Sequence, residues 1–288
     1  MPPPLLLLSD VDGTLLDDHG ALPCPPATLR AAVAALETAW GAPVTVGLAS
    51  SRTLRELTVL QRALGIYGPC IAEDGALRAV DVSANDGPGA ADAVDRQRHG
   101  TRTLALAQHA DNAVALHAAM ADEPAFIRAD TRRLPFAALQ RLGFRTPAAA
   151  RRALHARSHS VLIDPLVLNE VELDHLRRVS AARGLQLRRG GRWFTLTSAG
   201  GKGPALRALR HDAARTGGAP LIAAIGNEEN DVSLLAEADL RFVIRNPHRG
   251  PHPVLSALPD AIVLDGEGPG GWMDMLDRLT RRAAEVHA

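Results

Sequence analysis

Lysine is nearly absent from this sequence, and cysteine and aromatic residues are scarce. All but one of the 32 basic residues are arginine, and the exception is Lys202. The two cysteines, Cys24 and Cys70, lie far apart without metal-ligand spacing, which argues against a disulfide framework or a zinc site and favours buried thiols in a reducing cytosol. The arginine excess is typical of mutational bias. The retained lysine therefore draws attention to a position where a compact ammonium group is needed, because arginine does not replace it there.

The sequence also lacks an excess of either charge and any long apolar run. Its 32 acidic residues balance the 32 basic ones, so no global positive field favours nucleic acid or an anionic membrane as partner. The N-terminal MPPPLLLLSD imitates the apolar part of a signal peptide, but its leucines are too few and no basic residue precedes them. No segment approaches the roughly 18 apolar residues of a membrane span. We expect a soluble, cytoplasmic monomer or homodimer that acts on a small molecule.

What the sequence does contain is a regular alternation of apolar strands and amphipathic helices, in a chain of 288 residues that is long enough for two domains. The expected strands are 5–8, 42–50, 69–76, 220–226 and 240–246, and the helices between them are 27–40, 53–65, 203–215 and 231–238. This alternation predicts an α/β fold, a doubly wound parallel sheet covered on both faces by helices.

The middle of the chain interrupts this pattern. Residues 81–100 have no periodicity and are rich in Gly, Ala and Asp, which is typical of a linker or loose insertion. Beyond them, helical spacing and two separated strand segments predict a small α+β domain over 101–197, inserted into a core formed by 1–80 and 198–288. Its expected helices are 103–121, 147–156 and 170–184, and its strands are 159–163 and 192–198.

Two aspartates follow the first strand in the stretch LLLLSDVDGTLL. Asp10 and Asp12 stand at its carboxyl end, where open parallel sheets bind ligands, and alternation would turn both carboxylates to one side. Two close carboxylates repel each other unless a hard cation such as Mg²⁺ lies between them with phosphate oxygens. One Asp can then attack phosphorus while the other handles the proton of the leaving alcohol.

The motif Asp-x-Asp-Gly-Thr after an apolar strand is the signature of the haloacid dehalogenase-like phosphatases, and this sequence resembles them. The resemblance implies Asp10 as nucleophile and Asp12 as general acid and then base. It also implies a phosphate-binding Ser or Thr after the second strand, which Ser50 supplies. A lysine should follow the inserted domain, and Lys202 lies there, at the start of an expected helix whose amide dipoles favour an anion.

The sequence departs from this family at two positions. The stretch GNEEND (226–231) matches a Gly-Asp-x-x-Asn-Asp pattern, but Asn227 replaces the first Asp, normally a metal ligand. The implied Mg²⁺ ligands are therefore Asp10, Asp12 and Asn227, with Asp231 behind them, and we expect weakened or metal-demanding catalysis, to which Glu228 adds a possible compensating charge. Asp74 stands where many relatives have Asn, so a carboxylate would face the phosphate there.

Several stretches resemble one subfamily, the mannosyl-3-phosphoglycerate phosphatases of subclass IIB, which carry an α/β domain of the C2 type as a cap. These stretches are residues 50–76, 189–203 and GEGPGGW at 266–272. The resemblance implies release of phosphate to give mannosylglycerate, a compatible solute. The substrate-binding residues that it implies are Ser51, Arg52, Asp74, Gly75, Arg157, Ser160, Gly191 and Arg192. By contrast, Trp193 and Trp272 are expected in the core.

Three alternatives stay open on the sequence. The first is another sugar-phosphate phosphatase of the same subclass, which a substrate panel would separate. The second is a phosphotransferase similar to phosphomannomutase, which would move phosphate between hexose positions instead of releasing it. The third is a binding protein with weakened catalysis, and Asn227 is the feature that favours it.

Overall fold

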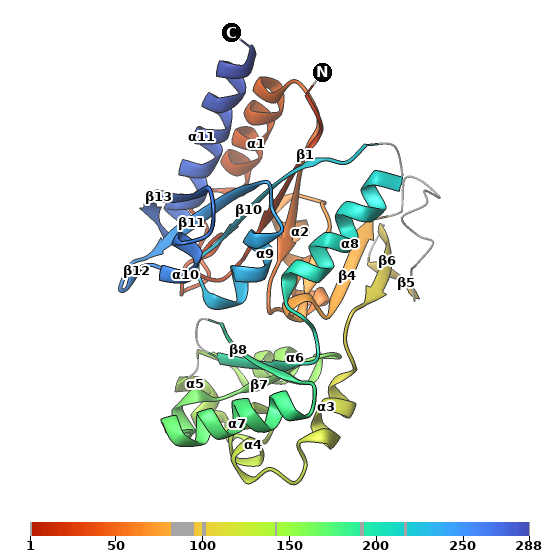
Figure 1. The fold of residues 1–288 in the computed structure, drawn as a ribbon, viewed down its shortest axis with the longest axis vertical. Coiled ribbons are helices and arrows are strands. Elements are labelled where there is room, and N and C mark those ends of the chain that lie inside the picture. The colour runs from red at the N-terminus through yellow and green to blue at the C-terminus, as the bar shows by residue number, and fades with distance from the viewer. Residues whose placement is uncertain are drawn as a thin grey trace.

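A computed structural model describes residues 2–81, 95–99, 102–141, 143–190, 193–215 and 218–287 of the chain. It has a large core and a smaller cap, which lies at one end of the core sheet (Figure 1). The chain passes between them after β6 (Arg102–Gln108) and again after β9 (Trp193–Thr197). No helix in the described ranges has the length and apolarity needed to cross a membrane.

The core is built on a ten-stranded sheet in the order β12-β11-β10-β1-β2-β3-β4-β6-β5, with β13 also paired to β11. Strands β13, β11, β10, β1, β2 and β3 are parallel, whereas β4, β6, β5 and β12 pair in antiparallel fashion. The strands are β1 (Leu5–Ser9), β2 (Val44–Ala49), β3 (Cys70–Ala72), β4 (Leu77–Asp81), β5 (Asp95–His99), β6, β10 (Leu221–Gly226), β11 (Leu240–Asn246), β12 (Gly250–Pro251) and β13 (Ala261–Glu267).

The leucine run that opens the sequence is the centre of this sheet, and its side chains feed two apolar layers. Leu5 and Leu7 pack with α1 (Pro26–Trp40), α2 (Leu54–Leu64) and α11 (Gly268–His287). Leu6 and Leu8 pack on the other face with α8 (Lys202–Arg215), α9 (Val232–Ala236) and α10 (Pro253–Ser256). A strand buried on both faces has no polar alternation, which is why β1 reads as an unbroken apolar run. The predicted doubly wound α/β core is therefore confirmed.

The cap is an antiparallel sheet in the order β7-β9-β8, covered by short helices. Its strands are β7 (Val161–Ile163), β8 (Gln186–Gly190) and β9, and its helices are α3 (Ala113–Ala119), α4 (Pro124–Ala129), α5 (Phe136–Arg141), α6 (Pro147–His155) and α7 (Glu170–Ala182), with single turns η3 (Thr131–Arg133) and η4 (Pro165–Val167). Two apolar clusters of its own hold it together, one of which includes Phe126 and Phe194.

The structure corrects the sequence predictions at the start of the cap. Residues 103–108 were predicted as part of a helix, but β6 is a strand hydrogen bonded to β4, so the core extends to Gln108 and the predicted boundary at 101 was wrong. Alternating small and apolar residues in this stretch fit both the helical period and the strand period, and only the pairing with β4 decides between helix and strand. Of the predicted linker 81–100, Asp81 and β5 belong to the core sheet, and 82–94 and 100 lie outside the described residues. Sequence analysis also missed the helices α4, α5, α10 (Pro253–Ser256) and α11 (Gly268–His287) and the strands β4, β8, β12 and β13.

Candidate active site

The candidate site lies where four core strands end, facing the cap (Figure 1). Asp10 follows β1, Ser50 follows β2, η1 (Glu73–Gly75) follows β3 and Asn227 follows β10. These strands are neighbours in the sheet and run parallel, so their carboxyl ends meet at one edge. The topology thus brings together residues from Asp10 near the start of the chain to Asn227 near its end.

A buried ion cluster forms the centre of the site. The Nζ of Lys202 donates to Oδ1 of Asp10 at 2.7 Å and to Oδ1 of Asp231 at 2.6 Å. The lysine side chain is fully buried, and those of Asp10 and Asp231 are 7% and 0% exposed. Oδ2 of Asp231 accepts from the backbone N–H groups of Asn227 and Glu228. Two carboxylates thus neutralise one buried ammonium, as burial of a charge requires.

Burial also changes the acidity of these groups. Removal from water, with repulsion from Asp231, raises the pKa of Asp10 to about 7, although Lys202 opposes the shift. Burial by itself lowers the pKa of Lys202, but the facing carboxylates of Asp10 and Asp231 raise it above the ordinary value for lysine. Lys202 therefore stays in its ammonium form and keeps a positive charge beside Asp10.

Asp12 lies in a different environment, on the side of the cleft. Strand β1 ends at Ser9, so alternation along a strand does not position Asp12; a tight turn does, with Leu16 donating to the carbonyl of Val11 and accepting from Gly13. Nε of Arg52 donates to Oδ2 of Asp12 at 3.0 Å, and an Nη of the same guanidinium donates to Oδ1 at 2.6 Å. The guanidinium binds both carboxylate oxygens, the planar geometry that arginine favours.

The turn after β2 and η1 after β3 are hydrogen bonded to each other. The hydroxyl of Ser50 is buried and accepts from the N–H of Arg52 at 3.2 Å. The N–H groups of Glu73 and Asp74 donate to the carbonyls of Arg52 and Ser50. We call residues Ser50–Arg52 the phosphate loop, because Ser50 stands where the family resemblance implies a phosphate-binding hydroxyl. Asp10, Ser50 and Lys202 are thus brought to one edge of the sheet.

Two oxygen atoms of the site are suited to bind a hard cation such as Mg²⁺. Oδ1 of Asn227 is buried and has no hydrogen-bond partner among the described residues, although such atoms are normally paired. Asn227 is held close to Gly13, where a Cβ atom would lie 2.3 Å from its Nδ2. Asp10 offers its second carboxylate oxygen. Both oxygens of Asp231 are occupied by hydrogen bonds, and the described residues contain no cluster of three His, Cys, Asp or Glu side chains that could hold a metal.

Asp74 and Gly75 lie beneath the site and not on the cleft wall. The Asp74 carboxylate accepts from Nδ2 of Asn230 at 3.0 Å and is 1% exposed. Gly75 has φ +97°, and a Cβ there would meet the carbonyl of Gly201 at 2.0 Å, so only glycine fits. Oδ1 of this carboxylate is therefore paired with an amide, whereas Oδ2 is buried without a hydrogen-bond partner among the described residues. Direct substrate contact by these two residues stays a prediction without geometric support.

A cleft of about 840 Å³ separates the core from the cap, and sequence-predicted residues Asp12, Ser51, Arg52, Arg157 and Asn227 line it. Its cap wall contains Phe144 and Trp193, whose rings are tilted at 44° with centroids 5.4 Å apart. Trp272 lies in the core as predicted, and its Nε1 donates to the Ser9 hydroxyl. Trp193, which was expected in the core, is partly buried at the start of β9, where it packs against one apolar cluster of the cap and also lines the cleft.

The remaining predicted cap residues are not equally placed. An Nη of Arg157 donates to the Ser51 carbonyl at 2.7 Å and to the Ser160 hydroxyl at 3.0 Å, so Arg157 connects the cap to the phosphate loop. Ser160 is 1% exposed and also donates to Glu73, so both its hydrogen-bonding roles are taken inside the protein. Gly191 and Arg192 lie outside the described residues.

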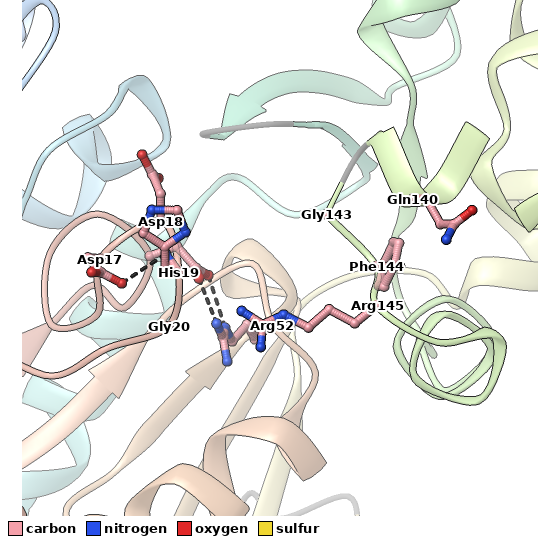
Figure 2. A pocket seen from close by; sticks show the side chains of 10 residues that line it. Asp17, Asp18, His19, Gly20, Arg52, Gln140, Gly143, Phe144 and Arg145 are labelled. Atoms are coloured by element: carbon pink, nitrogen blue, oxygen red, sulfur yellow. Dashed lines mark hydrogen bonds and ion pairs between the residues drawn. The ribbon is translucent and has the colours of Figure 1, made fainter. Parts of the chain in front are cut away.

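Sequence reasoning missed several residues at this interface. Arg145 extends from the cap toward Arg52 across a pocket also lined by the loop 17–20 (Figure 2). Glu228, by contrast, was named from the sequence as a compensating charge for Asn227; it is paired with Arg249 on the core side of the cleft, and burial raises the pKa of that carboxyl although Arg249 opposes it. Glu73, described below, joins cap and core. No motif identifies Arg145 or Glu73, because the groups that each of them faces are distant in the sequence.

No family model matches the chain. Solved structures similar to it over nearly its whole length include a phosphatase of the haloalkanoate dehalogenase superfamily from Bacteroides thetaiotaomicron, with 18% identity, 97% of this chain and 95% of that chain covered, and a TM-score of 0.61. The sucrose-phosphatase of Synechocystis, solved with sucrose and phosphate, has 18% identity, coverage of 97% and 98%, and a TM-score of 0.53. A haloacid dehalogenase-like hydrolase from B. subtilis has 17% identity, coverage of 95% and 99%, and a TM-score of 0.54. The chain therefore has the haloacid dehalogenase-like fold.

Proposed function

We propose that this protein is a Mg²⁺-dependent phosphomonoester hydrolase that works through an aspartyl-phosphate on Asp10. The observation that carries the proposal is the buried Asp10–Lys202–Asp231 cluster at the carboxyl edge of a haloacid dehalogenase-like sheet. A carboxylate next to a fixed ammonium group, at the end of a parallel strand, suits attack on an anionic phosphate ester. Lys202 and Ser50 would hold the phosphoryl oxygens.

In the first half of the reaction, a carboxylate oxygen of Asp10 forms a bond to phosphorus and the bond from phosphorus to the leaving alcohol breaks. Asp12 gives its proton to the leaving oxygen. Since Arg52 holds both oxygens of Asp12 in the structure, this step requires the guanidinium to yield at least one of them. Mg²⁺, held by Asp10 and Asn227, would supply charge neutralisation and alignment of the phosphoryl group.

In the second half, water attacks the phosphorus of the aspartyl-phosphate and Asp12 accepts its proton. The bond between Asp10 and phosphorus breaks, which returns the carboxylate and releases inorganic phosphate. Lys202 keeps its positive charge throughout, since Asp10 and Asp231 hold its pKa above the ordinary value against the effect of burial. The cap would exclude bulk water from the intermediate.

We further propose a phosphorylated sugar glycerate, mannosyl-3-phosphoglycerate, as the substrate. The tilted pair Phe144 and Trp193 offers an apolar face of the kind on which sugar rings lie, and the guanidinium groups of Arg52, Arg145 and Arg157 offer partners for a carboxylate. The Synechocystis relative of this fold, solved with sucrose and phosphate, supports a sugar ligand by analogy. Arg52 would have to exchange Asp12 for the substrate anion.

The test is phosphate release from mannosyl-3-phosphoglycerate, glucosyl-3-phosphoglycerate, sucrose phosphate and simple hexose phosphates, with and without Mg²⁺. In Asp10→Asn we expect release to fall by at least about 1,000-fold, since no nucleophile remains. In Asn227→Asp we expect the Mg²⁺ concentration for half-maximal rate to fall about tenfold, because a charged ligand replaces a neutral one. Release that persists in Asp10→Asn would contradict the mechanism. If a hexose phosphate is hydrolysed in preference, it replaces mannosyl-3-phosphoglycerate as the proposed substrate.

Asn227 also supports a second candidate, a binding protein of the same fold with weakened catalysis. A neutral amide brings no charge to the cation, and its oxygen has no other partner among the described residues. This candidate predicts that the sugar phosphate binds in calorimetry but is not hydrolysed, and that Asn227→Asp gains no activity. Transfer of phosphate between hexose positions, detected by ³¹P NMR, would instead favour the phosphotransferase.

A further inference from the structure

Glu73 is a buried carboxylate of the core whose side-chain hydrogen bonds all go to the cap. It is 1% exposed and lies at the start of η1. Oε1 accepts from the N–H and the hydroxyl of Ser158 at 3.0 and 3.1 Å. Oε2 accepts from the N–H of His159 at 2.8 Å and the hydroxyl of Ser160 at 2.7 Å. Hydrogen bonds to an ionised acceptor are the strong ones, so this carboxylate holds the segment 158–160 firmly.

The backbone of Glu73 is attached to the core just as firmly. Its N–H donates to the carbonyl of Arg52 at 2.9 Å, and the next N–H, of Asp74, donates to the carbonyl of Ser50 at 3.1 Å. Both residues have positive φ, +50° and +56°, which non-glycine residues rarely adopt. Such a conformation persists where the surroundings over-determine it, and often at functional sites. One residue thus binds the phosphate loop with its backbone and the cap with its side chain.

A second path leads from Glu73 back to the phosphate loop through the cap. The Ser160 hydroxyl that donates to Glu73 also accepts from Arg157, and Arg157 donates to the carbonyl of Ser51. Arg157 lines the cleft, whereas Glu73 does not. The position of this cap arginine over the phosphate loop therefore depends on a carboxylate that a substrate in the cleft would not contact.

These contacts lie on the side of the molecule where the chain crosses between core and cap. The N–H of Asp111 donates to the Ser198 hydroxyl, joining the two crossing segments, and the Thr197 hydroxyl donates to the carbonyl of His159. On the opposite side, loop 17–20 and cap residues 143–145 face each other across a pocket of about 440 Å³ (Figure 2). The cap is thus held at one side and separated from the core at the other.

We propose that Glu73 is a positioning residue, the fixed point that registers the cap on the phosphate loop, so that selection of the leaving group by the cap depends on it. The proposal rests on the proposed phosphatase function. It distinguishes two classes of phosphate ester. A sugar ester, which reaches the cap wall, needs Glu73, whereas a small aryl ester such as 4-nitrophenyl phosphate, bound mainly through its phosphate, does not.

The test compares Glu73→Gln with Glu123→Gln. Glutamine keeps the size of Glu73 but presents an NH₂ group to donors, so at least one oxygen's pair of hydrogen bonds is lost. Glu123 is the matched control because it is also a buried carboxylate, 8% exposed, whose hydrogen bonds to Ala125 and His175 stay inside the cap. Thermal unfolding by circular dichroism verifies that both variants fold. If Glu73→Gln does not fold, Ser160→Ala, which removes only the path through Arg157, takes its place.

In Glu73→Gln we expect the amide hydrogen of Ser158 or of His159, whichever then faces the NH₂ group, to exchange at least about tenfold faster by NMR, since it loses an acceptor worth about 1.4 kcal/mol or more. KM for the sugar phosphate should rise about tenfold, while kcat and KM for 4-nitrophenyl phosphate change less than about threefold. In Ser160→Ala the same split is expected, without faster exchange at Ser158. Glu123→Gln should leave all of these values unchanged.

In Glu73→Gln, unchanged exchange at both Ser158 and His159 would overturn the proposal. In Glu73→Gln or in Ser160→Ala, an equal loss with both esters would also overturn it, because that result indicates general damage to the core. Failure of the proposed function is recognised separately. If the wild type hydrolyses no phosphate ester, amide exchange and the radius of gyration from X-ray scattering still decide whether Glu73 fixes the cap, because neither requires turnover. If both the radius of gyration and the amide exchange are unchanged in Glu73→Gln, Glu73 does not fix the cap and the proposal is rejected.

Discussion

Asp10 and Asp12 are separated by one residue, yet they belong to two different regions of the molecule. Asp10 lies in the closed inner region with Lys202, with side chains 7% and 0% exposed. Asp12 lies on the open cleft wall with Arg52, with side chains 43% and 29% exposed. The inner pair uses a compact ammonium between two carboxylates, and the outer pair uses a planar guanidinium on one. This difference gives a physical reason for a chain otherwise rich in arginine to keep one lysine.

The largest expected effect on stability comes from removing the cation of each pair in turn. Lys202→Met leaves two buried carboxylates facing each other, and we expect the free energy of unfolding in urea to fall by about 3–5 kcal/mol. Arg52→Met, the matched change on the cleft wall, should cost less than about 1 kcal/mol, because an exposed ion pair contributes little. Equal losses in the two variants would show that the inner and outer regions do not differ in the way that their burial indicates.

The second prediction uses pH to isolate the inner region. Burial and Asp231 raise the pKa of Asp10 from 3.8 to about 7, against the opposing effect of Lys202. The folded state then keeps a proton that the unfolded chain releases near pH 4, so the contribution of Asp10 is present below that pH and lost as the pH rises through about 7. In urea titrations with EDTA, the stability of the wild type should fall relative to Asp10→Asn from about pH 4 to about pH 8. A constant difference over this range would contradict the raised pKa.

The smallest expected effect concerns the cap side of the cleft. Trp193→Ala removes the ring that packs against Phe144, and we expect KM for the sugar phosphate to rise about three- to tenfold, since an aromatic contact of this kind contributes about 0.5–1.5 kcal/mol. Hydrolysis of 4-nitrophenyl phosphate should not change. The control is Tyr67→Ala, which alters an exposed residue on the surface of the larger domain. A rise in KM for both esters would place Trp193 outside the selection of the leaving group.

The parts of the fold that could be predicted are those in which local pattern and tertiary pairing agree. The helix at 53–65 has a capping box of Thr53 and Glu56 and a glycine at its end, and it appears as α2. Residues 103–108 were misassigned because their neighbours in the sheet, not their own composition, make them a strand. Strand β8 was missed for a related reason: it is half exposed at the edge of a small sheet and has little apolar pattern of its own.

The candidate site shows the same division. Asp10, Ser50 and Lys202 were found from motifs, and the topology brings them to one sheet edge. The partner of Asp12, the amide that binds Asp74 and the cap contacts of Glu73 were not found, since each joins residues at least forty positions apart. No sequence period or composition encodes such a pair.

By itself, the sequence determined the doubly wound core, the buried strand that Asp10 follows and the importance of its single lysine. These follow from short-range rules: apolar runs are buried, helices have caps, and a charge at the end of a buried strand needs a partner. Only the tertiary structure decided that Lys202 lies between Asp10 and Asp231, that Trp193 lines the cleft and that Glu73 reaches into the cap. Those features depend on which strand ends and which cap residues are neighbours in space, and the free energy of such contacts exists only once the chain is folded.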